Sequence, residues 1–250
     1  MLPAFSLVIP AFNEADRIGQ SLRAALDYLE TNSPKSELIV VNDGSIDATS
    51  ERVRAAFAAT GSIATRLIEH SPNRGKGAAV RQGLLAATKQ IGLFSDADLS
   101  TPIEETPKLI EPIAAGETDI AFGSRALDRR LIGHRQPWRR EQGGRVFNLL
   151  VRLATGLPFW DTQCGFKAFR LDVCRPIFEK AQTDGFGFDV ELLYLARKAN
   201  LRMREIPVRW DHHEGSKVQF TRDSIRMLRE VMALRASPRS SQRDDPTIIS

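Results

Sequence analysis

The chain has 250 residues, of which 42% are hydrophobic, so it is long enough to bury the core of one α/β domain. Its 35 lysines and arginines against 31 aspartates and glutamates give a net charge of +4, which excludes a polycation that binds nucleic acid. Two cysteines, Cys164 and Cys174, form neither a metal-site spacing nor a disulfide framework. We therefore expect a protein of the reducing cytoplasm with no nucleic-acid partner.

The first half of the chain alternates strand and helix patterns. Helical spacing of apolar residues follows Asn13-Glu14, and an alanine-rich helix ends near Thr88. Strands alternating with helices favour a doubly wound, mostly parallel sheet flanked by helices. The apolar runs that predict the strands lie at residues 6–9, 37–42, 64–69, 91–95 and 119–124.

The second half is less regular and richer in arginine and glycine. Its apolar spacing predicts an amphipathic stretch over 147–153, a strand at the end of 161–170, a helix over 189–199 and a strand over 202–208. A last helix is expected over 222–235. Residues 237–250 are mostly Ser, Arg, Asp and Pro, which predicts a disordered tail.

Basic residues gather in two segments, 125–145 and 217–243. The first has seven arginines against Asp128 and Glu141. Such patches suit phosphates or an anionic membrane surface. No window approaches the roughly 18 continuous apolar residues of a spanning helix. We therefore expect a protein that, if it works at a membrane, lies on the inner surface of the cytoplasmic membrane.

A pair of carboxylates ends the fourth predicted strand. Asp96-Ala97-Asp98 follows the apolar run 91–94, and open α/β sheets bind ligands where their strands end. Divalent cations that carry substrate phosphates are held by few carboxylates. The pair therefore suggests a metal–nucleotide site, and the alternative is that it caps the helix that begins at Pro102. In a parallel sheet, the loops 10–14, 43–45 and 96–98 would gather at one edge.

Several motifs in this order resemble family-2 glycosyltransferases. The resemblance rests on 8–14 (VIPAFNE), 41–45 (VNDGS), 73–77 (NRGKG) and Asp96-Ala97-Asp98. Two later segments, 161–167 (DTQCGFK) and 188–192 (FDVEL), look like the branch of dolichyl- or polyprenyl-phosphate glucosyltransferases. The match runs from about Ser6 to the region of Lys217.

The resemblance implies a GT-A fold, an inverting reaction, a nucleotide-sugar donor, most simply UDP-glucose, and a divalent Mg²⁺ or Mn²⁺. It implies Asp98 as the metal ligand with Asp96 beside it, and Asp43 on the uracil. It also implies one domain over 1–236, with a nucleotide-sugar-binding half at 1–125 and an acceptor half at 126–236. The full set expected to bind the donor is Pro10, Ala11, Phe12, Glu14, Asp43, Lys76, Asp96, Ala97, Asp98, Arg125 and Lys217.

Two acids compete for the base that an inverting transfer uses. The polyprenyl-phosphate branch suggests Asp161, and Asp189, which opens a helix, is the rival; as an alternative, Asp189 is only a first-turn acid. An acceptor phosphate is largely ionised at neutral pH, since its second pKa is about 6, so a positive clamp matters more than a strong base. Gln163 and Lys167 are candidates to orient that phosphate, and Cys164 is expected to be structural.

Three other functions remain open at this point. The same donor site could serve a glycan, protein or small-molecule acceptor. A catalytically silent nucleotide-sugar-binding protein is disfavoured by the intact aspartates, and a nucleotidyltransferase is disfavoured because the N-terminal segment lacks a glycine-rich, arginine-containing loop. The leading prediction is transfer of a hexose to a polyprenyl phosphate at a membrane surface.

Overall fold

A single sheet of seven strands runs through the molecule, in the order β3-β2-β1-β4-β6-β5-β7. The computed structural model describes residues 1–133, 138–211, 227 and 230–232. All neighbouring strands are parallel except β6, which runs antiparallel to both β4 and β5. The strands are β1 (Phe5–Ala11), β2 (Glu37–Asn42), β3 (Ala64–Glu69), β4 (Ile91–Ser95), β5 (Ile120–Ser124), β6 (Phe166–Arg170) and β7 (Met203–Pro207).

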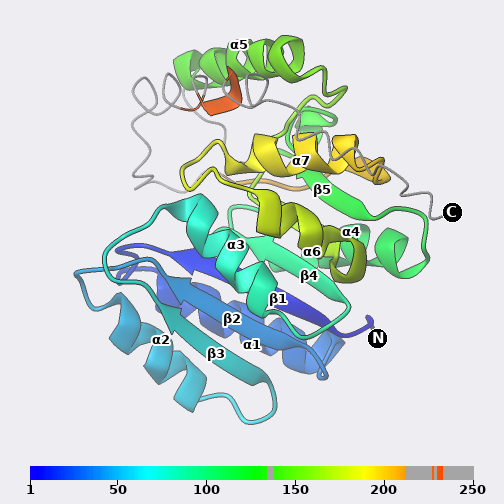
Figure 1. Cartoon of the computed structure of the whole chain (residues 1–250). Coiled ribbons are helices and arrows are strands. Elements are labelled where there is room, and N and C mark those ends of the chain that lie inside the picture. Colours follow the sequence, from blue (N-terminus) through cyan, green and yellow to red (C-terminus); the bar gives the residue numbers. More distant parts are fainter. Residues whose placement is uncertain (134–137, 212–226, 228–229, 233–250) are drawn as a thin grey trace, which may run out of the picture.

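Helices cover both faces of this sheet, as the alternation of patterns predicted (Figure 1). On one face lie α1 (Ile18–Asn32), α2 (Thr49–Ala58) and α4 (Thr106–Ala114). On the other lie α3 (Lys76–Ala86), α5 (Trp138–Thr155), α6 (Leu171–Lys180) and α7 (Phe188–Lys198). Two short 3₁₀ helices, η1 (Ile103–Glu105) and η2 (Arg129–Leu131), complete the described elements.

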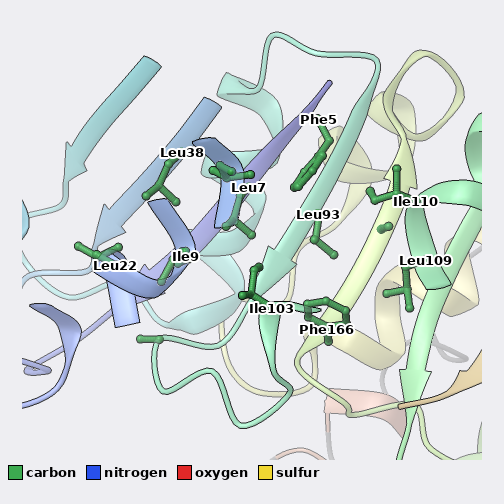
Figure 2. Close-up of a cluster of buried hydrophobic side chains, with 14 of the residues drawn as sticks. Phe5, Leu7, Ile9, Leu22, Leu38, Leu93, Ile103, Leu109, Ile110 and Phe166 are labelled. Carbon is green, nitrogen blue, oxygen red and sulfur yellow. The ribbon is translucent and has the colours of Figure 1, made fainter. Parts of the chain in front are cut away.

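The central strands are continuous apolar runs because both of their faces are buried. Along β1, Leu7 and Ile9 point into the core beneath α1, whereas Val8 points into the core beneath α3. Figure 2 shows the first of these clusters, in which Leu22 and Leu38 lie close to the β1 side chains. A strand that packs on both sides gives the residues after its last position little freedom to move.

Helix α3 lies unusually close to β1 at Gly83. A Cβ atom at this position would lie 2.3 Å from Val8 Cγ1 and 3.1 Å from Val41 Cγ2. Only a residue without a side chain permits this approach. The close packing fixes the beginning of α3, where Lys76 lies, relative to the ends of the strands.

The loops that follow β1, β2 and β4 meet at one edge of the sheet, as expected. The backbone N–H of Asn13 donates to Ser45 Oγ at 2.8 Å, and Asn13 Oδ1 accepts from the N–H of Ile46 at 2.9 Å. The antiparallel β6 starts at this same edge, so the loop before it joins them. Asp96 N–H donates to the carbonyl of Gly165 at 3.0 Å.

Several predicted features lie outside the described residues: Lys217, the tail 237–250, most of the basic segment 217–243 and most of the predicted helix 222–235. Within the part of the chain that the structure describes, no helix is long and apolar enough to cross a membrane. The division of the chain into a donor half and an acceptor half stays a prediction.

Candidate active site

The carboxylate pair at the end of β4 does not cap a helix. The N-terminal ends of η1, at Pro102, and of α4, at Glu105, have no side-chain hydrogen bond that caps them. Asp98 Oδ1 instead accepts from the N–H of Ser100 at 3.0 Å, a local turn that holds its carboxylate in place. About a third of the Asp96 side chain and a fifth of the Asp98 side chain remain exposed at the sheet edge. Both are therefore accessible to a ligand.

Each member of this pair has a basic neighbour. Lys76 Nζ lies 2.6 Å from Asp96 Oδ1, and Arg17 Nη1 lies 3.7 Å from Asp98 Oδ2. Burial lowers the pKa of Lys76, but Asp96 and Asp189 more than offset this, and the pKa is raised. Arg17 also pairs with Glu14 through two hydrogen bonds. Lys76 is thus held charged at the point where a diphosphate would meet the pair.

Asp43 is buried and anchors the loop before α3. Its Oδ1 lies 2.6 Å from His70 Nδ1 and accepts from the N–H of Arg74, and its Oδ2 accepts from Asn73 Nδ2 and the N–H of Gly75. A carboxylate has about four acceptor sites, so its capacity is filled within the protein. A contact of Asp43 with uracil would require one of these bonds to break, and that contact stays a prediction.

The remaining residues expected around the nucleotide lie beside this edge. Pro10 and Ala11 are buried at the end of β1, Phe12 is 40% exposed, and Glu14 is partly buried, with its N–H donating to Thr49 Oγ1. Ala97 is buried between the two aspartates. The structure therefore brings together the predicted donor-binding residues, apart from Lys217, which lies outside the described part of the chain.

Asp161 and Arg125 form a bidentate pair near the same edge. Arg125 Nε and Nη2 donate to the two carboxylate oxygens at 2.7 and 2.8 Å, and its backbone N–H donates to Oδ2. Burial raises the pKa of Asp161, but the Arg125 guanidinium outweighs it and the pKa lies below its usual value. Asp161 is therefore a poor proton acceptor, and it orients Arg125.

Glu205 on β7 holds the backbone next to this pair in place. It accepts from the backbone N–H groups of Trp160 and Asp161 and from Ser124 Oγ at 2.7 Å. These bonds connect residues 160–161 to the end of β5, and Arg125 is the next residue in the chain. Glu205 and Arg17 cannot be recognised from the sequence, because only the register of β5 with β7 and the meeting of two distant loops place them here.

Asp189 has a different environment. It lies in the first turn of α7, is 3% exposed, and its Oδ1 lies 2.6 Å from Nζ of Lys167. Burial raises the pKa of Asp189, and Lys167 and Lys76 only partly offset this. Of the two candidate bases, Asp189 is therefore the one whose carboxylate is better suited to accept a proton.

One of the predictions for the acceptor side is wrong. Lys167 is completely buried, with its ammonium on Asp189 and on the carbonyl of Cys164, so the prediction that it orients an acceptor phosphate is wrong. Gln163 Nε2 lies 3.0 Å from Met227 Sδ. Burial raises the pKa of the Cys164 thiol to about 11, which agrees with a structural role.

The carboxylates at the sheet edge fit a divalent metal ion that prefers oxygen ligands. Among the described residues, no three His, Cys, Asp or Glu side chains converge as a metal cage. Asp96 and Asp98 supply two hard oxygen donors, and Mg²⁺ is commonly held by one or two carboxylates while water and substrate phosphates complete its shell. The donor set therefore fits Mg²⁺ or Mn²⁺ bound together with a diphosphate.

This mostly parallel sheet, with acidic and basic side chains gathered where its strands end, defines an α/β protein of the GT-A type. A crystal structure of Mycobacterium tuberculosis glucosyl-3-phosphoglycerate synthase, in complex with Mn²⁺, UDP-glucose and phosphoglyceric acid, has the same fold. The TM-score is 0.64 at 19% identity, and the match covers 95% of this chain and 81% of that one. The predicted fold class is confirmed.

The family follows from sequence comparison. The model of glycosyl transferase family 2 matches residues 6–178. The dolichyl-phosphate beta-glucosyltransferase of Saccharomyces cerevisiae is 34% identical over 248 residues, which cover 92% of this chain and 73% of that protein. The Drosophila melanogaster protein of the same name is 39% identical over 226 residues, which cover 85% and 68%. The chain belongs to glycosyl transferase family 2, and the predicted resemblance to the dolichyl-phosphate glucosyltransferase branch is confirmed.

We predict that Asp161→Asn lowers the free energy of unfolding by about 1–3 kcal/mol at pH 7, because a buried bidentate partner of Arg125 is lost. Asp161 has a lowered pKa in the folded state, so its contribution is present above the ordinary value of about 3.9 and is lost as pH falls through the folded value. Urea unfolding at pH 7 and near pH 3 would measure this.

The matched control is Asp172→Asn, whose carboxylate is 71% exposed on α6. We expect the control to change stability by less than about 0.5 kcal/mol. An equal loss in both variants, or a loss at Asp161 that does not shrink in acid, would contradict the assignment.

Proposed function

We propose that this chain is an inverting, metal-dependent glycosyltransferase that moves glucose from UDP-glucose to a polyprenyl phosphate at the cytoplasmic face of a membrane. The observation that carries the proposal is the meeting of Asp96 and Asp98 with the Arg125–Asp161 pair at one sheet edge. Burial lowers the pKa of Arg125, but Asp161 raises it most and Asp96 raises it further, so the pKa lies above its ordinary value. The names of the relatives supply the sugar and the acceptor class.

On the donor side, Asp98 and Asp96 would hold the metal. When bound, Mg²⁺ or Mn²⁺ would neutralise charge that develops on the leaving diphosphate. Lys76 provides a second positive group, and it begins α3, whose N-terminal end favours anions. Arg17, which pairs with Glu14, lies 3.7 Å from Asp98 Oδ2 and provides a third positive group.

Arg125 was predicted to bind the donor, and here it is assigned to the acceptor side as the positive clamp. Both oxygens of Asp161 hold its guanidinium in one plane, and 30% of the Arg125 side chain remains exposed. A fixed guanidinium suits a phosphate. The acceptor oxygen attacks the anomeric carbon, the bond from that carbon to the UDP oxygen breaks with its electron pair, and any proton left on the acceptor phosphate passes to Asp189.

A donor and acceptor screen tests this function. Radiolabelled UDP- and GDP-sugars, with polyprenyl phosphate as acceptor, should give a labelled lipid from UDP-glucose.

We predict that Asp98→Asn lowers this turnover by about 10²-fold or more, because one of two metal-holding carboxylates becomes a weaker neutral ligand. Mn²⁺ binding measured with UDP present should weaken in parallel. The control is Asp16→Asn, an exposed aspartate in the loop before α1.

Normal turnover of Asp98→Asn at limiting metal would remove Asp98 from the site. Label appearing on a soluble acceptor and never on lipid would favour the alternative, a family-2 enzyme with a non-lipid acceptor. Tight UDP-sugar binding without transfer to any acceptor would favour a silent binding protein.

The role of Asp189 separates a phosphate acceptor from a hydroxyl acceptor. A phosphate loses its second proton at a pKa of about 6, whereas a sugar hydroxyl keeps its proton throughout the neutral range. We predict that Asp189→Asn lowers turnover by about 10²-fold near pH 5.5 and by much less near pH 8. Steady-state rates at saturating donor across this range would measure it. A loss of the same size at every pH would indicate a hydroxyl acceptor.

The membrane face of the proposal rests on α5 and the turn after it. Leu149, Leu150 and Leu153 are 54%, 40% and 70% exposed, and Trp160, 56% exposed, stacks under Arg152 at 4.1 Å. Figure 1 shows α5 along one rim of the molecule. Val151 on the same helix is fully buried, so α5 is attached to the core by its other side. An apolar face beside arginine and tryptophan suits the boundary between lipid head groups and acyl chains.

We predict that Leu149→Glu with Leu153→Glu lowers the affinity for anionic liposomes, measured by flotation, by about 10²-fold or more, since burial of two leucines contributes roughly 3–6 kcal/mol and each 1.4 kcal/mol is about tenfold. Salt should weaken binding of the unmodified protein as well. The control Ala114→Glu adds an acid to an exposed position at the end of α4 and should float normally. Equal flotation of all three proteins would rule out this face.

A further inference from the structure

Lys167 is a fully buried lysine in the interior of the sheet. It lies on β6, is 0% exposed, and is among the largest completely buried side chains of the described residues. Lysine is almost never fully buried unless it is paired. Its position between β4 and β5 leaves the ammonium no route to water, so its partners must account for it.

The ammonium has three contacts. Nζ lies 2.6 Å from Asp189 Oδ1 and donates to the carbonyl of Cys164 at 2.5 Å, and it lies 5.5 Å from the centroid of the Phe94 ring. Each contact is with an acceptor or with a ring face that favours a cation. The pocket is therefore built around a positive charge, and Asp189 is its carboxylate partner.

The pair is not explained by stability alone. A buried ion pair is often no more stabilising than apolar side chains of similar volume, because both charges lose their hydration. Apolar neighbours such as Phe94 and Phe188 would accept an apolar replacement in this region. The second charge near Asp189 is Lys76, which already pairs with Asp96. Lys167 is thus the cation assigned to Asp189.

We propose that Lys167 is a positioning residue for transfer, which keeps the Asp189 carboxylate ionised and fixes the oxygen that receives the acceptor's proton. This inference rests on the proposed function, in which Asp189 is the base. The anchor is rigid because Lys167 is held by the backbone of β6 and by Cys164, both in the core. Asp189 is also close enough to Lys76 and Asp96, at the sheet edge, for both to affect its pKa.

The charged groups that face Asp189 come from several elements. Burial raises the pKa of Asp189, Lys167 and Lys76 lower it, and Asp96 raises it. Glu191, on the same helix as Asp189, accepts hydrogen bonds from the backbone N–H groups of Gln182 and Thr183. Glu230, which is not on this helix, accepts from the N–H of Gly187. With Lys167 removed, the pKa of Asp189 would rise further. The acid would then be protonated at pH values where the enzyme needs it ionised.

The test compares Lys167→Met in two backgrounds, the unmodified chain and Asp189→Asn. Turnover at saturating donor and polyprenyl phosphate is measured near pH 6, and circular dichroism checks the fold of each variant. We expect Lys167→Met to lower turnover about tenfold or more in the unmodified chain, one pKa unit being tenfold, and to have no further effect with Asp189→Asn. The rise of turnover with pH should also move to higher pH in Lys167→Met.

Two further variants keep the test decisive. Lys167→Arg retains the charge and should restore most of the turnover and the original pH midpoint. Lys180→Met removes an exposed lysine from α6 and should change neither. If Lys167→Met does not fold, the double variant, which leaves no unpaired buried charge, is compared with Asp189→Asn alone and should turn over equally.

The outcomes are distinguishable. An equal fractional loss from Lys167→Met in both backgrounds, or a pH midpoint that does not move, would make Lys167 structural and overturn the inference while Asp189 remains the base. Unchanged turnover of Asp189→Asn near pH 6 would overturn the base assignment itself, and Lys167 with it.

Discussion

The site depends on one constraint: charges that converge at a sheet edge must be neutralised by partners held in the protein. Each of its carboxylates has such a partner, Lys76 for Asp96, Arg17 for Asp98, Arg125 for Asp161 and Lys167 for Asp189. Unpaired carboxylates this close would repel one another and bind protons instead. The pairing keeps the edge both acidic and ordered.

The pairs differ in what they leave available. Asp161 gives both oxygens to Arg125, so the exposed end of that pair is the cation. Asp189 and Lys167 are both almost fully buried, with 5% and 0% of their side chains exposed, so this pair presents no charge at the surface. In the proposed mechanism the partly exposed Arg125 of the first pair is the positive clamp, and the buried Asp189 of the second pair is the proton acceptor.

The sequence carried the local part of this arrangement. Continuous apolar runs that end in Asn42 or Asp96 predict buried parallel strands with polar ends, and both strands are found. What the sequence lacks is pairing across long separations. Nothing in the pattern 166–170 shows that β6 lies between β4 and β5, so the sequence does not predict the burial of Lys167 and suggests instead that this residue orients the acceptor phosphate. The same gap hid the four internal bonds of Asp43, whose donors are 27–32 residues away in the chain.

The antiparallel strand β6 also limits where the chain could be divided into two parts. β5 touches β4 only through β6, since the order is β4-β6-β5. A chain cut after Ser124 would keep β4 and β5 but lose β6 and β7, leaving one edge of β4 and both edges of β5 unpaired near the aspartate pair. Exchanging acceptor specificity between relatives by joining halves at this point would therefore place the β6 of one relative between the β4 and β5 of the other, beside the donor site. A working chimaera would have to exchange surface loops around an intact sheet.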